Sequence, residues 1–324
     1  MVVINFFNVR DSHSAGKLIA DYFKLNSQEV IEELKPYKGE DYDLLQFIKK
    51  FKIDLERQYH KVTFITCRHA TTTYDELKLL KDKGLLNLNK MLDEETPLSK
   101  FLFEHGITIN VGGKTLMFNG IRYPLYKYDE VCGQCIFEAY ECESIFTNKP
   151  NYKDCDYRRA LYLLHSKLYH DKCEIEVFLD AEISDIYEYD SVRYSPEILN
   201  TIEQILAFYD AKKYNLQDMW RDIPNNKYYI LEFDIPIEAF DYATTKSTYE
   251  RYWDIEEIAD HFGYTEWDFE DNTISTQFYL NLFLIKNLVN KFIWGKAKKY
   301  GQILPETIIT CDSIRVIREH HIND

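Results

Sequence analysis

The fold is decided by residues 62–71, which read VTFITCRHAT. β-branched and aromatic side chains dominate residues 62–66, and such side chains favour a strand. Polar residues, among them Arg68 and His69, follow at the end of this strand. The preceding sequence has a different pattern, so the change near Lys61 marks the start of a sheet-containing domain.

Helical patterns flank this strand on both sides. Before it, apolar residues recur at three- and four-residue steps over residues 14–25, 27–36 and 40–60. These segments predict a helical N-terminal leader over residues 1–60. After the strand, Thr73 and Glu76 fit the Thr-x-x-Glu capping box of a helix, and Gly84 fits the residue that ends it.

Residues 61–190 combine further strands with short helices. Thr96 and Pro97 fit the cap and first residue of a helix that ends at Gly106. Asn119-Gly120 is typical of a two-residue hairpin turn. A helix is expected over residues 158–169, and strands are expected over residues 107–111, 115–118, 121–123, 131–137 and 174–179. We therefore predict a central mixed or antiparallel sheet domain.

The remaining residues, 191–324, predict a second α+β region. Its longest helix, over residues 275–299, is apolar on most of its face and is therefore expected to be buried. Other helices are expected over residues 195–213 and 254–261, and a strand is expected over residues 228–235. Residues 302–304 and 314–317 fit two closing strands or a strand and a short helix. The predicted class is α+β.

Composition and charge restrict the class of protein. The chain has 324 residues, of which 45% are hydrophobic, so it can bury a sizeable core. It opens without a basic region and apolar stretch, and its longest apolar runs, such as residues 282–285, are far shorter than the ~20 residues that span a bilayer. We therefore expect a cytoplasmic protein without membrane contact, whose seven cysteines are reduced.

Several catalytic and metal-binding motifs are missing from the sequence. It has no Gly-x-x-x-x-Gly-Lys, Gly-x-Gly-x-x-Gly, His-Glu-x-x-His or Gly-x-Ser-x-Gly pattern. Cys132 and Cys135 form a Cys-x-x-Cys, but the second close pair of a typical zinc site is missing. Reduced structural thiols, a zinc site and a redox pair remain as interpretations, and no metal is expected.

The order of three short motifs resembles the ADP-ribosyltransferase-like fold over roughly residues 61–190. These motifs are His69-x-Thr71 at a strand end, Gly84-Leu85 after a helix, and Glu174-x-Glu176 on a later strand. The resemblance implies an enzyme, in a bacterial or phage protein, that uses NAD to transfer ADP-ribose or that hydrolyses NAD.

The resemblance also implies a role for each residue. Glu176 would steady the cation that develops when the nicotinamide–ribose bond breaks, and Glu174 would orient or activate the acceptor. His69 would hydrogen-bond the ribose with support from Thr71. Tyr140 is the candidate for an aromatic ring that stacks on nicotinamide.

Purely structural interpretations of these residues stay open. His69 fits a core histidine satisfied by the main chain. Glu174 and Glu176 fit the wet face of an edge strand whose other face is apolar. Residues 302–306 offer a competing strand that would place the active carboxylate in the other half of the chain.

A non-catalytic function is the alternative. The formal charge is −15, and residues 250–271 hold nine acidic residues and one arginine. Such a surface suits a basic protein partner, as in a phage-encoded inhibitor that covers a nucleic-acid-processing defence enzyme. Direct nucleic-acid binding is not expected, and the composition is compatible with a homo-oligomer. The candidate contact residues are Tyr252, Trp253, Glu256, Glu257, Trp267 and Asp268.

Overall fold

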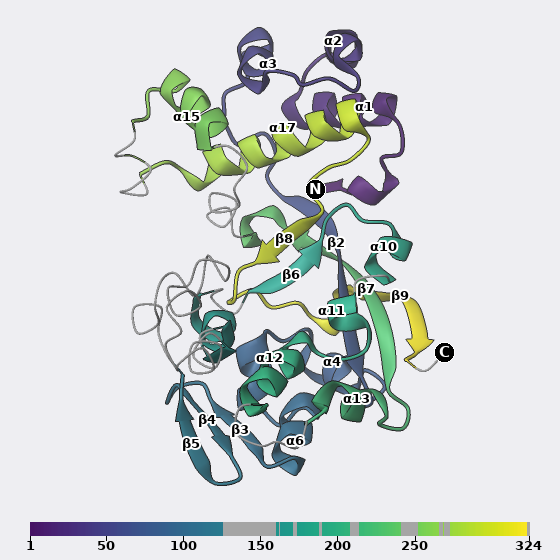
Figure 1. Cartoon of the computed structure of the whole chain (residues 1–324). Helices are drawn as coiled ribbons and strands as arrows, with labels where there is room; N and C mark the ends of the chain where they lie inside the picture. The colour runs from purple at the N-terminus through teal and green to yellow at the C-terminus, as the bar shows by residue number, and fades with distance from the viewer. Residues whose placement is uncertain are drawn as a thin grey trace, which may run out of the picture. The chain divides into compact units, whose positions relative to one another are not determined.

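The computed structural model confirms the α+β class (Figure 1). The structure describes residues 1–125, 160–161, 163–170, 174–187, 190–207, 214–240, 252–265, 268 and 273–322. The strand expected over residues 131–137, the Cys132/Cys135 pair and Tyr140 lie outside these residues.

The chain divides into two compact units whose segments interleave along the sequence. Unit 1 comprises Met1–His69, Glu176–Glu182 and Glu232–Ile303, and unit 2 comprises Ala70–Ile175, Ile183–Leu231 and Leu304–Asp324. The expected leader, residues 1–60, belongs wholly to unit 1, whereas residues 61–190 and 191–324 each contribute to both units.

Unit 1 contains the N-terminal helices and a long buried helix. These are α1 (Ser12–Phe23), α2 (Ser27–Leu34), α3 (Leu44–Phe51), α15 (Tyr252–His261) and α17 (Thr276–Trp294). The helix expected over residues 40–60 is wrong in length, because Asp43 caps α3 and Lys52 adopts the left-handed conformation directly after it.

Gly16 of α1 leaves room for the side chains of Ile31 and Phe292, since a Cβ added at Gly16 would lie 2.6 Å and 3.1 Å from them.

Helix α17 confirms the prediction of a long buried helix, but it ends at Trp294 rather than at the expected Lys299. Ser275 caps its first turn by accepting from the amide of Phe278, and Gly295 ends it at a φ of 71°. The buried Asn281 on α17 donates to the main-chain oxygens of Leu55 and Arg57, 2.8 Å and 2.9 Å away. The helix thereby fixes the chain that leads into the sheet.

The larger sheet has the strand order β8-β6-β2-β7-β9, and β1 pairs with β2 off this path. Strand β1 runs parallel to β2, with Val2 opposite Thr63, whereas β2 and β6 are antiparallel. The strands are β1 (Val2–Ile4), β2 (Thr63–Thr73), β6 (Ile175–Phe178), β7 (Lys227–Pro236), β8 (Tyr300–Ile303) and β9 (Ile314–His321).

Unit 2 contains the expected three-stranded meander and a helical core. Strands β3 (Ile107–Asn110), β4 (Thr115–Phe118) and β5 (Ile121–Pro124) are antiparallel neighbours. The Asn119-Gly120 turn is confirmed, with both residues at positive φ. The helices around them include α5 (Leu88–Asp93), α6 (Pro97–Glu104), α12 (Glu197–Leu206), α13 (Leu216–Arg221) and the π-helical turn Ser166–His170.

The capping box assigned to Thr73 and Glu76 is wrong. Thr73 is still part of β2. Helix α4 (Lys78–Lys83) begins later, and its N-cap residue, Leu77, makes no side-chain capping hydrogen bond. The carboxylate of Asp75 instead accepts from the amide of Leu79 at 2.9 Å. The stop at Gly84 is confirmed by its φ of 77°, and an added Cβ there would lie 2.1 Å from the carbonyl oxygen of Ile309.

Candidate functional site

The strands that carry two of the sequence motifs are neighbours in the sheet. Arg68 of β2 lies opposite Phe178 of β6. The next residue of β2, His69, places its ring Nδ1 2.9 Å from the main-chain oxygen of Glu176. A hydrogen bond thus connects His69 to a residue 107 positions away, and both belong to unit 1.

This hydrogen bond assigns the tautomer of His69. A carbonyl oxygen can only accept, so Nδ1 carries the proton and donates it. Desolvation lowers the pKa of His69 below its ordinary value, against a smaller opposing effect of the hydrogen bond to Glu176. At neutral pH the imidazole is therefore uncharged, and its Nε2 carries a lone pair that can accept a hydrogen bond. The side chain keeps part of its surface exposed.

The carboxyl group of Glu176 is exposed. Along β6, Ile175 and Val177 are buried while Glu176 between them faces solvent. The observed contact joins the imidazole of His69 to the main chain of Glu176, so the strand position of this glutamate is fixed while its carboxylate stays accessible.

Arg68, beside His69, is held by three groups. Its Nε donates to Glu232 Oε2 at 3.0 Å, its Nη1 donates to the oxygen of Ala181 at 3.2 Å, and its guanidinium lies 3.8 Å from the ring centroid of Phe7. The side chains of Arg68 and Glu232 are only 13% and 15% exposed. A largely buried arginine with these three contacts positions the strand that carries His69.

The end of β6 is fixed by a buried ion pair. Lys291 Nζ on α17 lies 2.7 Å and 2.8 Å from the two carboxylate oxygens of Asp180, and both side chains are 9% exposed. Asp180 also accepts from the amide of Ala297 at 2.6 Å. The sequence analysis missed this pair, since nothing in the local pattern joins residues 111 positions apart.

The other residues implied by the resemblance are placed separately. Thr71 lies on β2 with a partly buried side chain, and Glu174, also partly buried, directly precedes β6. The competing strand over residues 302–306 is shorter than expected, because β8 ends at Ile303 and Glu306 lies in a turn. The roles of Thr71, Glu174 and Tyr140 stay predictions.

The acidic tract is only partly described. Glu257 on α15 is exposed and Glu256 is partly buried, whereas Trp267 and the side chains of Tyr252 and Trp253 lie outside the described residues. Asp268 accepts from the amide and hydroxyl of Thr265 and from the hydroxyl of Thr273, and these bonds lower its pKa. This carboxylate is therefore engaged by Thr265 and Thr273, and the docking role of the tract stays a prediction.

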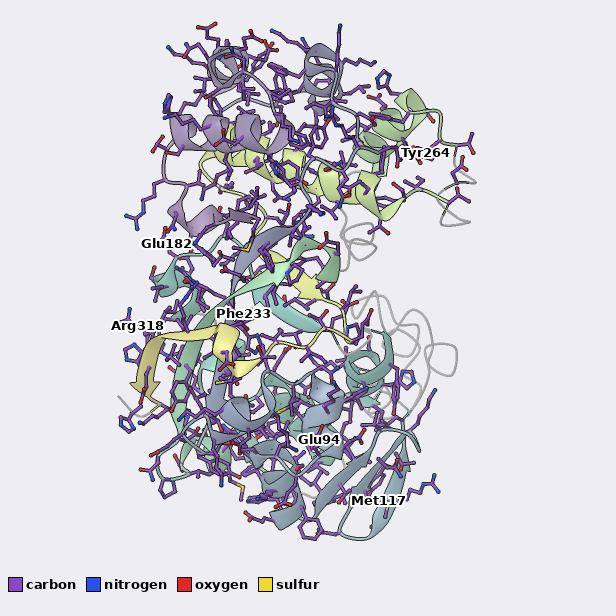
Figure 2. All side chains as sticks on the ribbon, turned by 180° about the vertical axis from the view of Figure 1, so that it is seen from behind. Glu94, Met117, Glu182, Phe233, Tyr264 and Arg318 are labelled. Atoms are coloured by element: carbon purple, nitrogen blue, oxygen red, sulfur yellow. The ribbon has the colours of Figure 1, made fainter. Side chains whose placement is uncertain are left out.

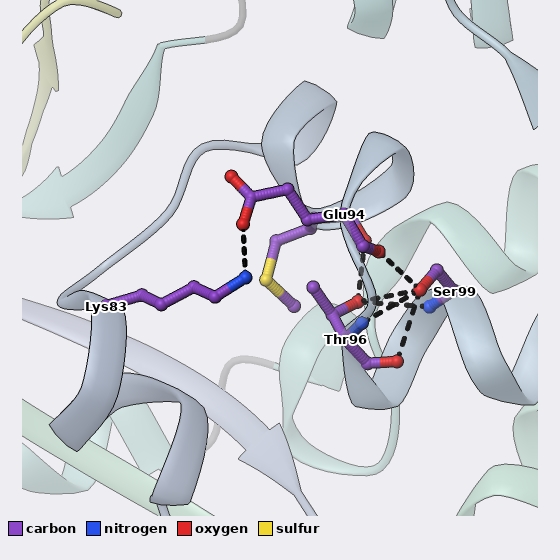
Figure 3. A network of polar contacts seen from close by, with 5 residues as sticks. Lys83, Glu94, Thr96 and Ser99 are labelled. Atoms are coloured by element: carbon purple, nitrogen blue, oxygen red, sulfur yellow. Dashed lines mark hydrogen bonds and ion pairs between the residues drawn. The ribbon is translucent and has the colours of Figure 1, made fainter.

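Unit 2 holds a pocket of about 400 Å³ between α5, α6 and β3. Of its lining residues, Glu94 pairs with Lys83, and Ser99 exchanges the hydrogen bonds of a capping box with Thr96 (Figure 3). Glu95 pairs with Lys100 at 2.8 Å. These groups serve local structure, and the pocket lining includes neither His69 nor Glu176.

The described residues hold neither a metal-binding cluster nor a membrane-spanning helix. Within that part of the chain, no group of three or more metal-ligating side chains could hold an ion. No described helix combines the length and apolar character that crossing a membrane requires.

Comparisons of the chain with protein-family models, with curated proteins and with solved structures found no match. What the site can do therefore follows from its own residues.

Proposed function

We propose that the chain cleaves the nicotinamide–ribose bond of NAD and passes the ADP-ribose to an acceptor or to water. One observation supports this proposal above the others: the imidazole of His69 bonds to the main chain of Glu176. These two residues belong to separate motifs that resemble the ADP-ribosyltransferase-like fold, and they meet on paired strands.

The protonation of His69 suits a cationic substrate. With the proton on Nδ1, Nε2 can accept a hydrogen bond from a ribose hydroxyl. The lowered pKa keeps the ring neutral, so it adds no positive charge beside the pyridinium ring or the developing ribosyl cation. A protonated imidazole would repel both.

The carboxylate of Glu176 supplies a negative charge, which attracts the cation that a protonated imidazole would repel. It is exposed and therefore accessible to substrate, and a negative charge at the ribose stabilises a cation more strongly in the transition state than in the ground state. Arg68 and Asp180 fix the two strands and act as positioning residues.

The test is nicotinamide release from NAD, measured chromatographically in the presence of a cell lysate as the source of acceptors. The wild-type protein should release nicotinamide, and Glu176→Gln should reduce the rate by about 100-fold or more. Glu29→Gln, which neutralises an exposed glutamate on α2, is the matched control and should leave the rate unchanged. The proposal fails if the wild-type protein releases no nicotinamide above the level that the lysate alone releases, or if Glu176→Gln keeps the wild-type rate.

A further inference from the structure

Unit 2 gathers arginine and tyrosine side chains at one surface. Helix α10 (Ile183–Tyr187) ends in Tyr187, and the guanidinium of Arg193, the last residue of α11 (Asp190–Arg193), lies 4.1 Å from the centroid of that ring. Arg318 of β9, labelled in Figure 2, lies 5.8 Å from the same centroid. Two cations from distant parts of the sequence thus share one aromatic ring.

Further contacts hold both guanidinium groups in place. Arg193 Nη2 donates to the hydroxyl of Tyr187 at 2.9 Å and lies near the ring of Tyr194. Arg318 Nε donates to His320 Nε2 at 2.6 Å, and the His320 ring lies 5.0 Å from that of Tyr187. Each of these two hydrogen bonds uses one nitrogen of a guanidinium, so further N–H donors of each planar fork remain.

The charge of these arginines is not neutralised by the described part of the chain. Neither Arg193 nor Arg318 has an ion-pair partner among the described residues, and Glu319 pairs with Lys227 at 2.6 Å. Arg318 is exposed on β9, the last strand in the order of the larger sheet, and it shares a face of this strand with His320, because side chains two residues apart on a strand point the same way. Two guanidinium groups without an ion-pair partner among the described residues therefore lie around one tyrosine ring, on a chain whose formal charge is −15.

We propose that this Arg–Tyr surface, made of Tyr187, Arg193, Tyr194, Arg318 and His320, binds the backbone of single-stranded nucleic acid. Guanidinium forks match phosphate geometry, and the planes of arginine side chains, like aromatic rings, are surfaces on which unpaired bases stack. An acidic chain favours a single strand over a duplex, which carries charge more densely. The sequence predicts no nucleic-acid contact because its net charge is negative. That net charge is a sum over the whole chain and does not show where individual arginines gather.

The proposal goes beyond NAD cleavage and does not depend on it, because all five residues belong to unit 2. The test is fluorescence anisotropy of a labelled oligothymidylate of about 16 nucleotides, the upper range for one small binding site, over a series of salt concentrations. The wild-type protein should bind with an affinity that falls with salt. Arg193→Ala and Arg318→Ala should each weaken binding and reduce the log–log salt slope by about 0.7, the value for one phosphate contact on a single strand.

Two further variants make the result specific. Arg122→Ala removes an exposed arginine from β5 and should leave the affinity unchanged. Arg318→Lys retains the charge and should restore part of the salt slope, which separates a phosphate contact from a loss of folding.

The proposal is overturned if no saturable binding occurs at low salt, or if Arg122→Ala weakens binding as much as Arg318→Ala does. It is also overturned if a duplex or phosphatidylserine vesicles bind more tightly than the single strand.

Discussion

The hydrogen bond of His69 reconciles two interpretations that the sequence left open. A core histidine satisfied by the main chain and a histidine that binds ribose need different nitrogen atoms. Nδ1 is used by the main chain of Glu176, which leaves Nε2 for a ligand. The sequence could predict the residue from its place in a strand-end motif, but not the tautomer, because the acceptor lies 107 positions away.

We expect the folded protein to resist protonation of His69. Desolvation lowers its pKa below the ordinary value of about 6.5, so below that pH the unfolded chain binds more protons than the folded one does. The free energy of unfolding should therefore decrease as pH falls below about 6.5, until the folded-state pKa is passed. An NMR titration of the His69 ring should give a midpoint below 6.5, and a midpoint at or above it would contradict this account. His69→Gln should remove this contribution from denaturation curves at several pH values.

At the scale of elements, helix caps illustrate what sequence chemistry can and cannot predict. Thr96 followed by proline predicted the start of α6 correctly, and the hydroxyls of Thr96 and Ser99 complete the cap. The Thr73–Glu76 pattern reads equally well but is wrong, because β2 continues through Thr73 and the chain turns at Glu76 and Leu77 with positive φ. Strand pairing overrides the local signal there.

Thr96→Ala should destabilise the protein by about 1 kcal/mol, because the amide of Ser99 loses its acceptor at the start of α6. Urea denaturation measures this change. Thr276→Ala, at an exposed threonine in the first turn of α17 where Ser275 is the cap, is the matched control and should cost less. An equal loss in the two variants would contradict the assignment of the cap to Thr96.

Lys291→Met should be more damaging, because it leaves Asp180 buried without its cation. Breaking a buried pair on one side costs about 3–5 kcal/mol. Lys296→Met, at an exposed lysine just after the same helix, is the control and should change the free energy of unfolding little. The double variant Lys291→Met/Asp180→Leu should recover part of the loss. If Lys291→Met matched the control in denaturation, the pair would not fix α17 to the end of β6.

For the molecule as a whole, the sequence predicted which helices and strands form better than it predicted how these elements are divided between the two units. The α+β class, the meander around Asn119-Gly120 and the buried α17 follow from local periodicity and turn chemistry. The interleaving of two units does not, because it depends on contacts such as that of Arg68 with Glu232, 164 positions apart. Net charge is also a whole-chain quantity, and it conceals the Arg–Tyr surface.

The central claim is that His69 and Glu176 together form an NAD site. The most direct test is nitrogen NMR of the protein labelled with ¹⁵N at histidine, in the Glu176→Gln variant, so that bound NAD is not consumed. Saturation with NAD should move the His69 Nε2 resonance in the direction of hydrogen-bond acceptance, while Nδ1 stays protonated and bound to the main chain. Unchanged His69 resonances at saturating NAD, or a proton on Nε2 in the free protein, would contradict the account.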